Sequence, residues 1–190
     1  MAQHLAHVRV PRSLATERPA VRVPHVEPAP YRGAEFLIDD STLDSTTIAL
    51  AAARADVIRV RHGAGLPTHA AVRALVRMLD DEVAAVGRDR ADVLVVLEVE
   101  TVVAADEADA ARRRSHLAYA AAFSHVPWQR GETMLVAPLD ALAAEVADVL
   151  RRTGVDAVEL TLVGASRRQA PQVAAALTPD PAPTPSSSPW

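Results

Sequence analysis

The sequence predicts an α/β protein built on a parallel sheet, and three observations lead to this prediction. Apolar runs typical of strands alternate with amphipathic helical segments between residues 34 and 163. The strand-like runs are rich in valine and leucine, as is typical of strands buried on both faces. Helical connections between strands imply right-handed crossovers in one parallel sheet. Ligands of such folds bind at the carboxyl ends of the strands, which are therefore the first places to search for a site.

Composition indicates one globular core and excludes several classes of function. The chain has 190 residues, of which 49% are hydrophobic and 23% charged, while aromatic residues make up only 3%. The core must therefore consist of alanine, valine and leucine. A net charge of -4 argues against a protein that binds nucleic-acid backbones. No cysteine is present, which excludes disulfides, thiolate metal sites and cysteine nucleophiles.

No segment resembles a membrane span or an export signal. No apolar run reaches the roughly 20 residues that a transmembrane helix needs. The first residues lack a continuous apolar region and a small-residue cleavage site. We therefore expect a cytoplasmic protein without a membrane partner.

Changes in composition divide the chain into three parts. Residues 1–33 are proline-rich and are expected to form an amino-terminal arm, in which only residues 20–23 resemble a strand. Residues 34–168 carry the α/β pattern. Residues 169–190 are rich in proline and serine and are expected to be a disordered tail, because they cannot bury enough surface to fold.

The first half of the α/β part reads as strand, helix, strand, helix. An apolar run at residues 34–40 ends in two acids, and a polar turn leads into an alanine-rich helix. Ser41, Asp44 and Ser45 are candidate caps for that helix. A strand is expected at residues 56–61, followed by a glycine-containing loop. Thr68 is a plausible cap for the next helix, which Gly87 ends.

The second half begins with the longest strand-like run, at residues 93–103. A helix follows, with Asp106 or Asp109 as its cap and a solvated arginine cluster on its surface. A long connection then leads to Pro138, which is expected to start a helix at the first helical position. A turn at Gly154 and a strand at residues 156–163 complete the pattern.

Three segments in this order resemble the carboxyl-terminal half of the bacterial luciferase-like flavin-dependent monooxygenases. They are ALAAARADVIRVR, AAVGRDRADVLVVLEVETVVAADEADAARRR and PLDALAAEVADVLRRTGVDAVELTLV. The three segments lie within residues 49–163, and the resemblance as a whole covers roughly residues 36 to 163. The resemblance implies a partial (β/α)8 (TIM) barrel, with about four parallel strands and flanking helices. A complete barrel needs about 250 residues, and the family's amino-terminal half has no counterpart here.

The resemblance also implies a cofactor and a class of reaction. Members of this family use reduced FMN or, in some relatives, the deazaflavin F420, and oxidise small organic substrates. We expect a flavin-dependent oxidoreductase or monooxygenase whose missing half comes from a homo-oligomer or from a full-length or complementary barrel. The alternative is a non-catalytic half-barrel remnant that serves as a dimerisation or flavin-binding module.

By the same resemblance, the turn after residues 35–39 corresponds to the family's flavin-phosphate turn. Ser41, Thr42, Ser45 and Thr46 are the candidate cofactor-binding residues. This turn lacks glycine, and the acids at positions 39, 40 and 44 would repel a phosphate dianion. Ordinary helix capping is the alternative role for these hydroxyls.

Three further residues are candidate catalytic groups at the barrel mouth. Glu98 and Glu100 point to the same face of their strand, because side chains alternate across a strand. Paired carboxylates could perform acid/base chemistry or bind a flavin ring; solvent exposure or salt bridges to arginine are the alternatives. His62 follows a strand end, where catalytic groups of such barrels lie, although it could also be a surface residue. No metal-binding or nucleotide-phosphate motif is present.

Overall fold

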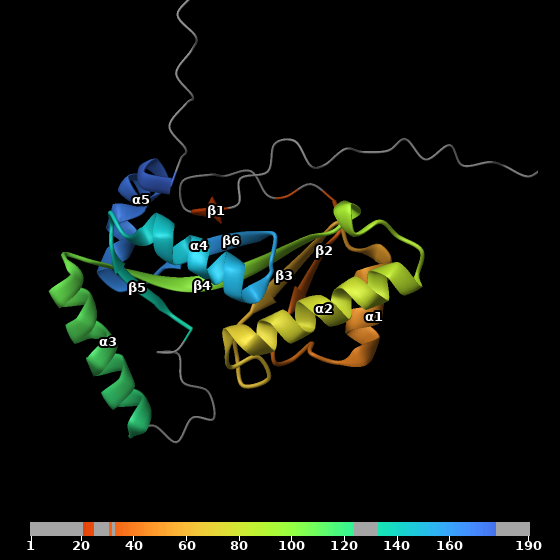
Figure 1. The fold of residues 1–190 in the computed structure, drawn as a ribbon, viewed down its shortest axis with the longest axis horizontal. Helices are drawn as coiled ribbons and strands as arrows, with labels where there is room; N and C mark the ends of the chain where they lie inside the picture. Colours follow the sequence, from red (N-terminus) through yellow and green to blue (C-terminus); the bar gives the residue numbers. More distant parts are fainter. Residues whose placement is uncertain (1–20, 25–30, 32, 124–132, 178–190) are drawn as a thin grey trace, which may run out of the picture.

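The computed structural model describes residues 21–24, 31, 33–123 and 133–177. In this part of the chain, six parallel strands form one sheet in the order β1, β6, β4, β3, β2, with β5 pairing alongside β4 (Figure 1). This confirms the predicted α/β architecture of a partial barrel. The strands are β1 (Val21–Arg22), β2 (Glu35–Ile38), β3 (Val57–Arg61), β4 (Leu94–Ala104), β5 (Leu135–Pro138) and β6 (Ala157–Leu162).

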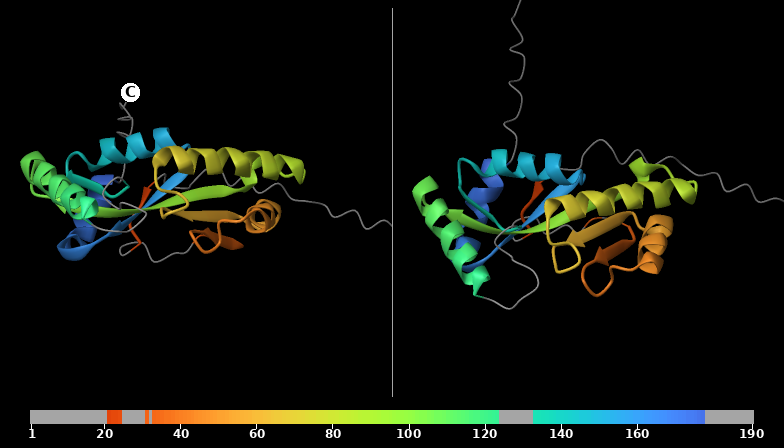
Figure 2. Two further views of the ribbon diagram at one scale, coloured as in Figure 1. Left: turned by 90° about the horizontal axis from the view of Figure 1, so that it is seen from below. Right: turned by 60° about the horizontal axis from the view of Figure 1, so that its bottom comes forward.

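Five helices lie around the sheet in the described part of the chain, and four of them pack into its main core. The helix that follows β4 is the exception, because it packs against Ala104 and Val136 in a separate cluster. The five helices are α1 (Ser45–Arg54), α2 (His69–Ala85), α3 (Glu107–Ala122), α4 (Leu142–Thr153) and α5 (Ala170–Leu177), with 3-10 turns at Arg90–Asp92 and Gly164–Gln169. Figure 2 shows α2 and α4 lying along the same face of the sheet. Their buried residues join α1 and alternate strand residues in the main core. None of the described helices has the length and apolarity needed to cross a membrane.

Strand β4 is the centre of the sheet because it pairs with three other strands. Its first half lies beside β3, with Arg61 level with Glu98, and β6 runs along its other edge. Its last residues, Thr101 to Ala104, pair with β5. The alternating strand residues Val95, Leu97 and Val99 are buried toward the helices. Glu98 and Glu100 therefore lie on the opposite face, here called the inner face.

The short strand β1 gives the sheet a barrel-like order. Val21 pairs with Val158 of β6, so the first and last strands of the described residues lie side by side. First and last strands are also neighbours in a closed (β/α)8 barrel. Tyr31 packs against a small inner-face cluster that includes Val96. The amino-terminal segment thus contributes both a strand and a covering side chain.

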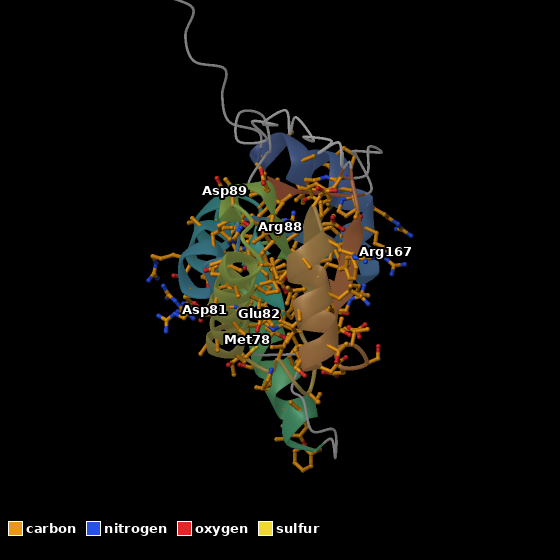
Figure 3. The ribbon with its side chains drawn as sticks, turned by 90° about the vertical axis from the view of Figure 1, so that its right-hand side faces the viewer. Met78, Asp81, Glu82, Arg88, Asp89 and Arg167 are labelled. Atoms are coloured by element: carbon orange, nitrogen blue, oxygen red, sulfur yellow. The ribbon has the colours of Figure 1, made fainter. Side chains whose placement is uncertain are left out.

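Local signals in the sequence set most helix boundaries. Among the three candidate caps of α1, it is Asp44 that accepts a hydrogen bond from the Thr47 N–H, and Thr68 caps α2. Asp106 caps α3. Figure 3 shows Met78, Asp81 and Glu82 on the outer side of α2, as its amphipathic pattern predicts.

Glycine and arginine then close the carboxyl ends of these helices. Gly87 and Gly154 adopt φ values of 70° and 73°, left-handed conformations that glycine adopts without strain. The Arg88 guanidinium donates to the carbonyl oxygens of Ala52 and Ala55, each at 2.8 Å, and so satisfies the end of α1.

Two elements differ from the sequence expectations. Pro138 does not start a helix: it is the last residue of β5, and α4 begins at Leu142. The preceding apolar residues, including Leu135 and Val136, are buried beside β4, and this pairing determines their conformation. Residues 170–177, expected in the disordered tail, form α5 because Ala170 and Val173 are buried in the main core. Residues 178–190, most of the amino-terminal arm and residues 124–132 lie outside the described part.

Candidate functional site

A cavity of about 520 Å³ opens at the carboxyl ends of the strands. Its wall is formed by residues that lie in or just after β2, β3, β4 and β6, together with Thr133 before β5. Four of the seven predicted site residues line this cavity, namely Ser41, His62, Glu98 and Glu100. The remaining lining residues are Asp39, Asp40, Arg61, Gly63, Thr133 and Thr161.

His62 is buried in the wall, with only 7% of its surface exposed. Its Nδ1 lies 2.9 Å from the Leu66 carbonyl oxygen, and because a carbonyl only accepts, Nδ1 carries the proton in this contact. Its Nε2 is buried and has no hydrogen-bond partner among the described residues. Burial lowers the pKa of His62 below its ordinary value, which favours the neutral ring. A neutral ring held in this way keeps a lone pair at Nε2.

His69, the first residue of α2, lies against His62. The two ring centroids are 5.5 Å apart, and the His69 Nε2 is also buried without a partner in the described structure. Burial and the nearby Arg152 lower the pKa of His69. These two histidines mark the two ends of the loop between β3 and α2, so their contact closes that loop at its base.

Glu98 is held by arginines from the neighbouring strand. Arg59 Nε donates to its Oε1 at 2.8 Å, and Arg61 Nη2 donates to its Oε2 at 2.7 Å. Its carboxylate is therefore in salt bridges, which was the alternative to a catalytic role. Glu100, two residues further along, lines the same cavity.

These contacts belong to a charged ladder on the inner face. In the strand register Glu98 lies beside Glu159, and Glu159 lies beside Arg22. Arg59 bridges the two glutamates, since its Nη2 contacts both Glu98 and the almost fully buried Glu159. Two like charges on adjacent strands are thus compensated by arginine.

In the predicted phosphate turn, Ser41 and Thr42 donate hydrogen bonds to neighbouring residues of the same segment. Ser41 donates to Asp39 Oδ1 twice, from its N–H at 2.9 Å and from its hydroxyl at 2.7 Å. Thr42 Oγ1 donates to the Leu37 carbonyl oxygen at 2.9 Å. The hydrogen bonds from Ser41 lower the pKa of Asp39, which favours the carboxylate. Ser45 and Thr46 lie exposed in the first turn of α1, and neither lines the cavity.

Asp40 makes a second contact of this kind with the loop after β3. Its carboxylate accepts hydrogen bonds from the N–H groups of Ala64 at 2.9 Å and Gly65 at 2.8 Å. The backbone donors of that loop therefore also point at an acid of the protein.

Comparison with solved structures supports the fold. No protein-family model matches the chain, and no curated protein matches its sequence. Among solved structures, EDTA monooxygenase (EmoA) from Chelativorans sp. BNC1 is 14% identical with a TM-score of 0.53, over 70% of this chain and 42% of that one. DmoA from Hyphomicrobium sulfonivorans is 12% identical with a TM-score of 0.52, over 75% and 39% of the two chains. An F420-dependent secondary alcohol dehydrogenase is 10% identical with a TM-score of 0.51, over 76% and 47%.

These solved structures belong to the luciferase-like group, whose members here include a monooxygenase and a dehydrogenase. The chain has a partial luciferase-like barrel fold. It spans less than half the length of these relatives, at 42%, 39% and 47%. One structure in this group carries an F420-acetone adduct, and riboflavin lyase (RcaE) was solved with a modified FMN.

The donor groups of this luciferase-like barrel do not fit a flavin phosphate at the predicted turn. The Ser41 N–H and hydroxyl are bonded to Asp39, and the Ala64 and Gly65 N–H groups are bonded to Asp40. The cavity wall carries four carboxylates against one guanidinium, from Asp39, Asp40, Glu98 and Glu100 against Arg61. A phosphate would meet repulsion here and would have to displace existing hydrogen bonds. The described residues also contain no group of three or more metal-ligating side chains.

Sequence reasoning missed the arginines and the third glutamate of the site. Arg59 and Arg61 lie two residues apart in β3, as Glu98 and Glu100 do in β4 and Glu159 and Thr161 do in β6. Polar residues at this spacing in otherwise apolar strands indicate one shared polar face. That repeated spacing was the available signal, and the strand register brings the residues together.

Proposed function

We propose that this chain forms one wall of a luciferase-like barrel and functions by associating with further barrel strands. The other strands would come from a second copy or from a complementary chain. The observation that supports this proposal most strongly is the open arc of the described sheet, which has β1 at one edge and β2 at the other. A closed barrel has no edge, and open strand edges favour pairing with another chain.

The inner face of the edge strand offers a surface for such a contact. Leu37 in β2 is only half-buried, and it alternates with Phe36 and Ile38, which pack toward the helices. It therefore lies on the inner face, which strands from another chain would cover. Covering the apolar Leu37 side chain with strands of another chain would remove it from water and so favour association.

A flavin-dependent oxidoreductase is the second candidate function. In this reading, a completed barrel would use FMN or F420 to oxidise a small organic substrate. It is favoured by one observation, that His62, Glu98 and Glu100 line a single cavity at the strand ends. With its Nδ1 proton bonded to Leu66, His62 keeps its lone pair at Nε2, which would act as a proton acceptor only after becoming accessible to a substrate. Because Ser41 and Thr42 already donate within the turn, and Ser45 and Thr46 lie outside the cavity, the partner would have to bind the flavin phosphate.

Light scattering coupled to gel filtration tests the association directly. We expect a mass above that of a monomer, and we expect Leu37→Lys to reduce it, since the new charge would be buried in the contact. Leu50→Lys is the matched control, because Leu50 is 43% exposed on the outer helix α1. A wild-type monomer at all concentrations would contradict the proposal. Equal effects of the two substitutions would instead show that the inner face is not covered.

A further inference from the structure

The loop after β3 is built around the carboxylate of Asp40. Successive N–H groups of Ala64 and Gly65 donate to its two oxygens, at 2.9 and 2.8 Å. Adjacent backbone N–H groups that converge on one anion form a nest, an arrangement that proteins use to bind phosphate and other anions. In this chain the anion in the nest is a side chain of the protein itself.

Two glycines allow the loop to close this tightly. A Cβ atom at Gly63 would lie 2.4 Å from both oxygens of the Asp40 carboxylate. A Cβ atom at Gly65 would lie 2.6 Å from Leu43 Cδ2. Both distances are shorter than side-chain carbons tolerate, so a side chain at position 63 or 65 would force Asp40 or Leu43 to move from its present place. The shape of the loop and the presence of Asp40 are therefore linked.

The negative charge around the nest also opposes the binding of a phosphate group. Asp39 precedes Asp40 and takes both donors of Ser41, so the turn and the loop each have their donors bonded to an acid. Glu98 and Glu100 add two more carboxylates to the same cavity wall. A phosphate group that entered this cavity would find the nest N–H groups already bonded to Asp40. The carboxylates around Asp40 would also repel it.

We propose that Asp40 is a specificity-determining residue that excludes phosphate-bearing ligands from the cavity by occupying the anion nest with its own carboxylate. The cavity then admits uncharged or cationic small molecules. This inference goes beyond the barrel-wall proposal, because it concerns which ligands the mouth admits and not which chain completes the barrel.

Replacing Asp40 tests the inference through a gain of binding. Asp40→Ala removes the charge and frees the N–H groups of Ala64 and Gly65. Asp40→Asn is the matched control, because it removes the charge but leaves an oxygen that can accept from the nest. Inorganic phosphate is the probe, titrated at low ionic strength by calorimetry and by ³¹P line broadening. We expect D40A to bind phosphate roughly tenfold or more tightly than either the wild type or D40N, because two unsatisfied donors become available.

Three results would overturn the inference. The first is a folded D40A protein, with a cooperative melt, that binds phosphate no better than the wild type. The second is a wild type that already binds phosphate as tightly as D40A. The third is equal binding by D40A and D40N, which would assign the effect to charge and not to the nest. If D40A does not fold, Asp40→Ser replaces it with the same expected gain, because its shorter side chain leaves room for an anion.

The outcome can be separated from that of the association proposal. Light scattering on D40A should give the wild-type mass, because Asp40 bonds to a loop of its own chain. If D40A changes the mass in solution without a gain in phosphate binding, this inference is contradicted. The comparison of L37K with L50K then tests the association by itself.

Discussion

Removing the central arginine of the inner face should cost more stability than its exposure suggests. Arg59 contacts Glu98 at 2.7 Å, Glu35 at 3.3 Å and also Glu159, which is only 4% exposed. Arg59→Met would leave two glutamates on adjacent strands with less compensation. Breaking a buried ion pair typically costs 3–5 kcal/mol. Because Arg22 and Arg61 still contact Glu159 and Glu98, we expect a loss of about 2–4 kcal/mol.

Urea unfolding followed by circular dichroism measures this loss, and a double-mutant cycle assigns it. Glu159→Gln should offset part of the damage in the Arg59→Met background, with a coupling energy of about 1 kcal/mol or more. Arg113→Met is the exposed control, since its contact with Asp109 lies on the surface of α3 and should contribute less than about 1 kcal/mol. A loss below about 1 kcal/mol for Arg59→Met, or strictly additive effects in the cycle, would refute the ladder as a coupled network.

Three further predictions follow from single contacts. Thr68→Ala should destabilise the protein by about 1 kcal/mol in urea unfolding, since the Thr68 side chain caps α2, whereas Thr68→Ser should retain most of the stability. Leu97→Ala should cost about 2–5 kcal/mol by the same measurement, because Leu97 is fully buried in the central strand; a loss below about 1 kcal/mol would contradict its place in the core. Since the pKa values of His62 and His69 are lowered in the folded state, the unfolded chain binds more protons, so stability should be retained above the ordinary histidine pKa and fall as the pH drops below it. Thermal melts across this pH range should show a weaker acid-side decline in His62→Gln, and an unchanged decline would contradict the assignment.

Periodicity was enough to predict the main strands and helices. The eleven residues of β4 form an almost uninterrupted apolar run, and α2 repeats apolar residues at helical spacing between Thr68 and Gly87. Their boundaries follow from local chemistry, namely a hydroxyl cap at one end and a glycine at the other. Such features act within a few residues, so a sequence displays them directly.

The elements that sequence reasoning missed depend on contacts between distant residues. Pro138 can start a helix or end a strand, and pairing with β4 decides in favour of the strand. Likewise, α5 lies in a segment that reads as a tail until Ala170 and Val173 are buried against the core. Tertiary packing overrides local preference in both cases.

The candidate site was predictable in its location but not in its bonding. The sequence predicted a site near the strand ends that contains His62, Glu98 and Glu100, and all three line one cavity, although the two glutamates lie within β4. The sequence also indicated that the acids near Ser41 would oppose a phosphate. It could not show that Asp40 reaches across to the loop after β3, because that contact joins residues 24 and 25 positions apart.

Titration of FMN by fluorescence quenching tests the central claim most directly, namely that the mouth of this chain does not hold a flavin phosphate. Wild-type protein, at a concentration where its assembly state is known, should give no saturable quenching at FMN concentrations below about 1 mM. Saturable binding with one FMN per chain and a Kd of about 1 μM would contradict the claim. Such an affinity corresponds to a net binding free energy of about -8 kcal/mol, which an acidic turn whose donors are already bonded does not supply.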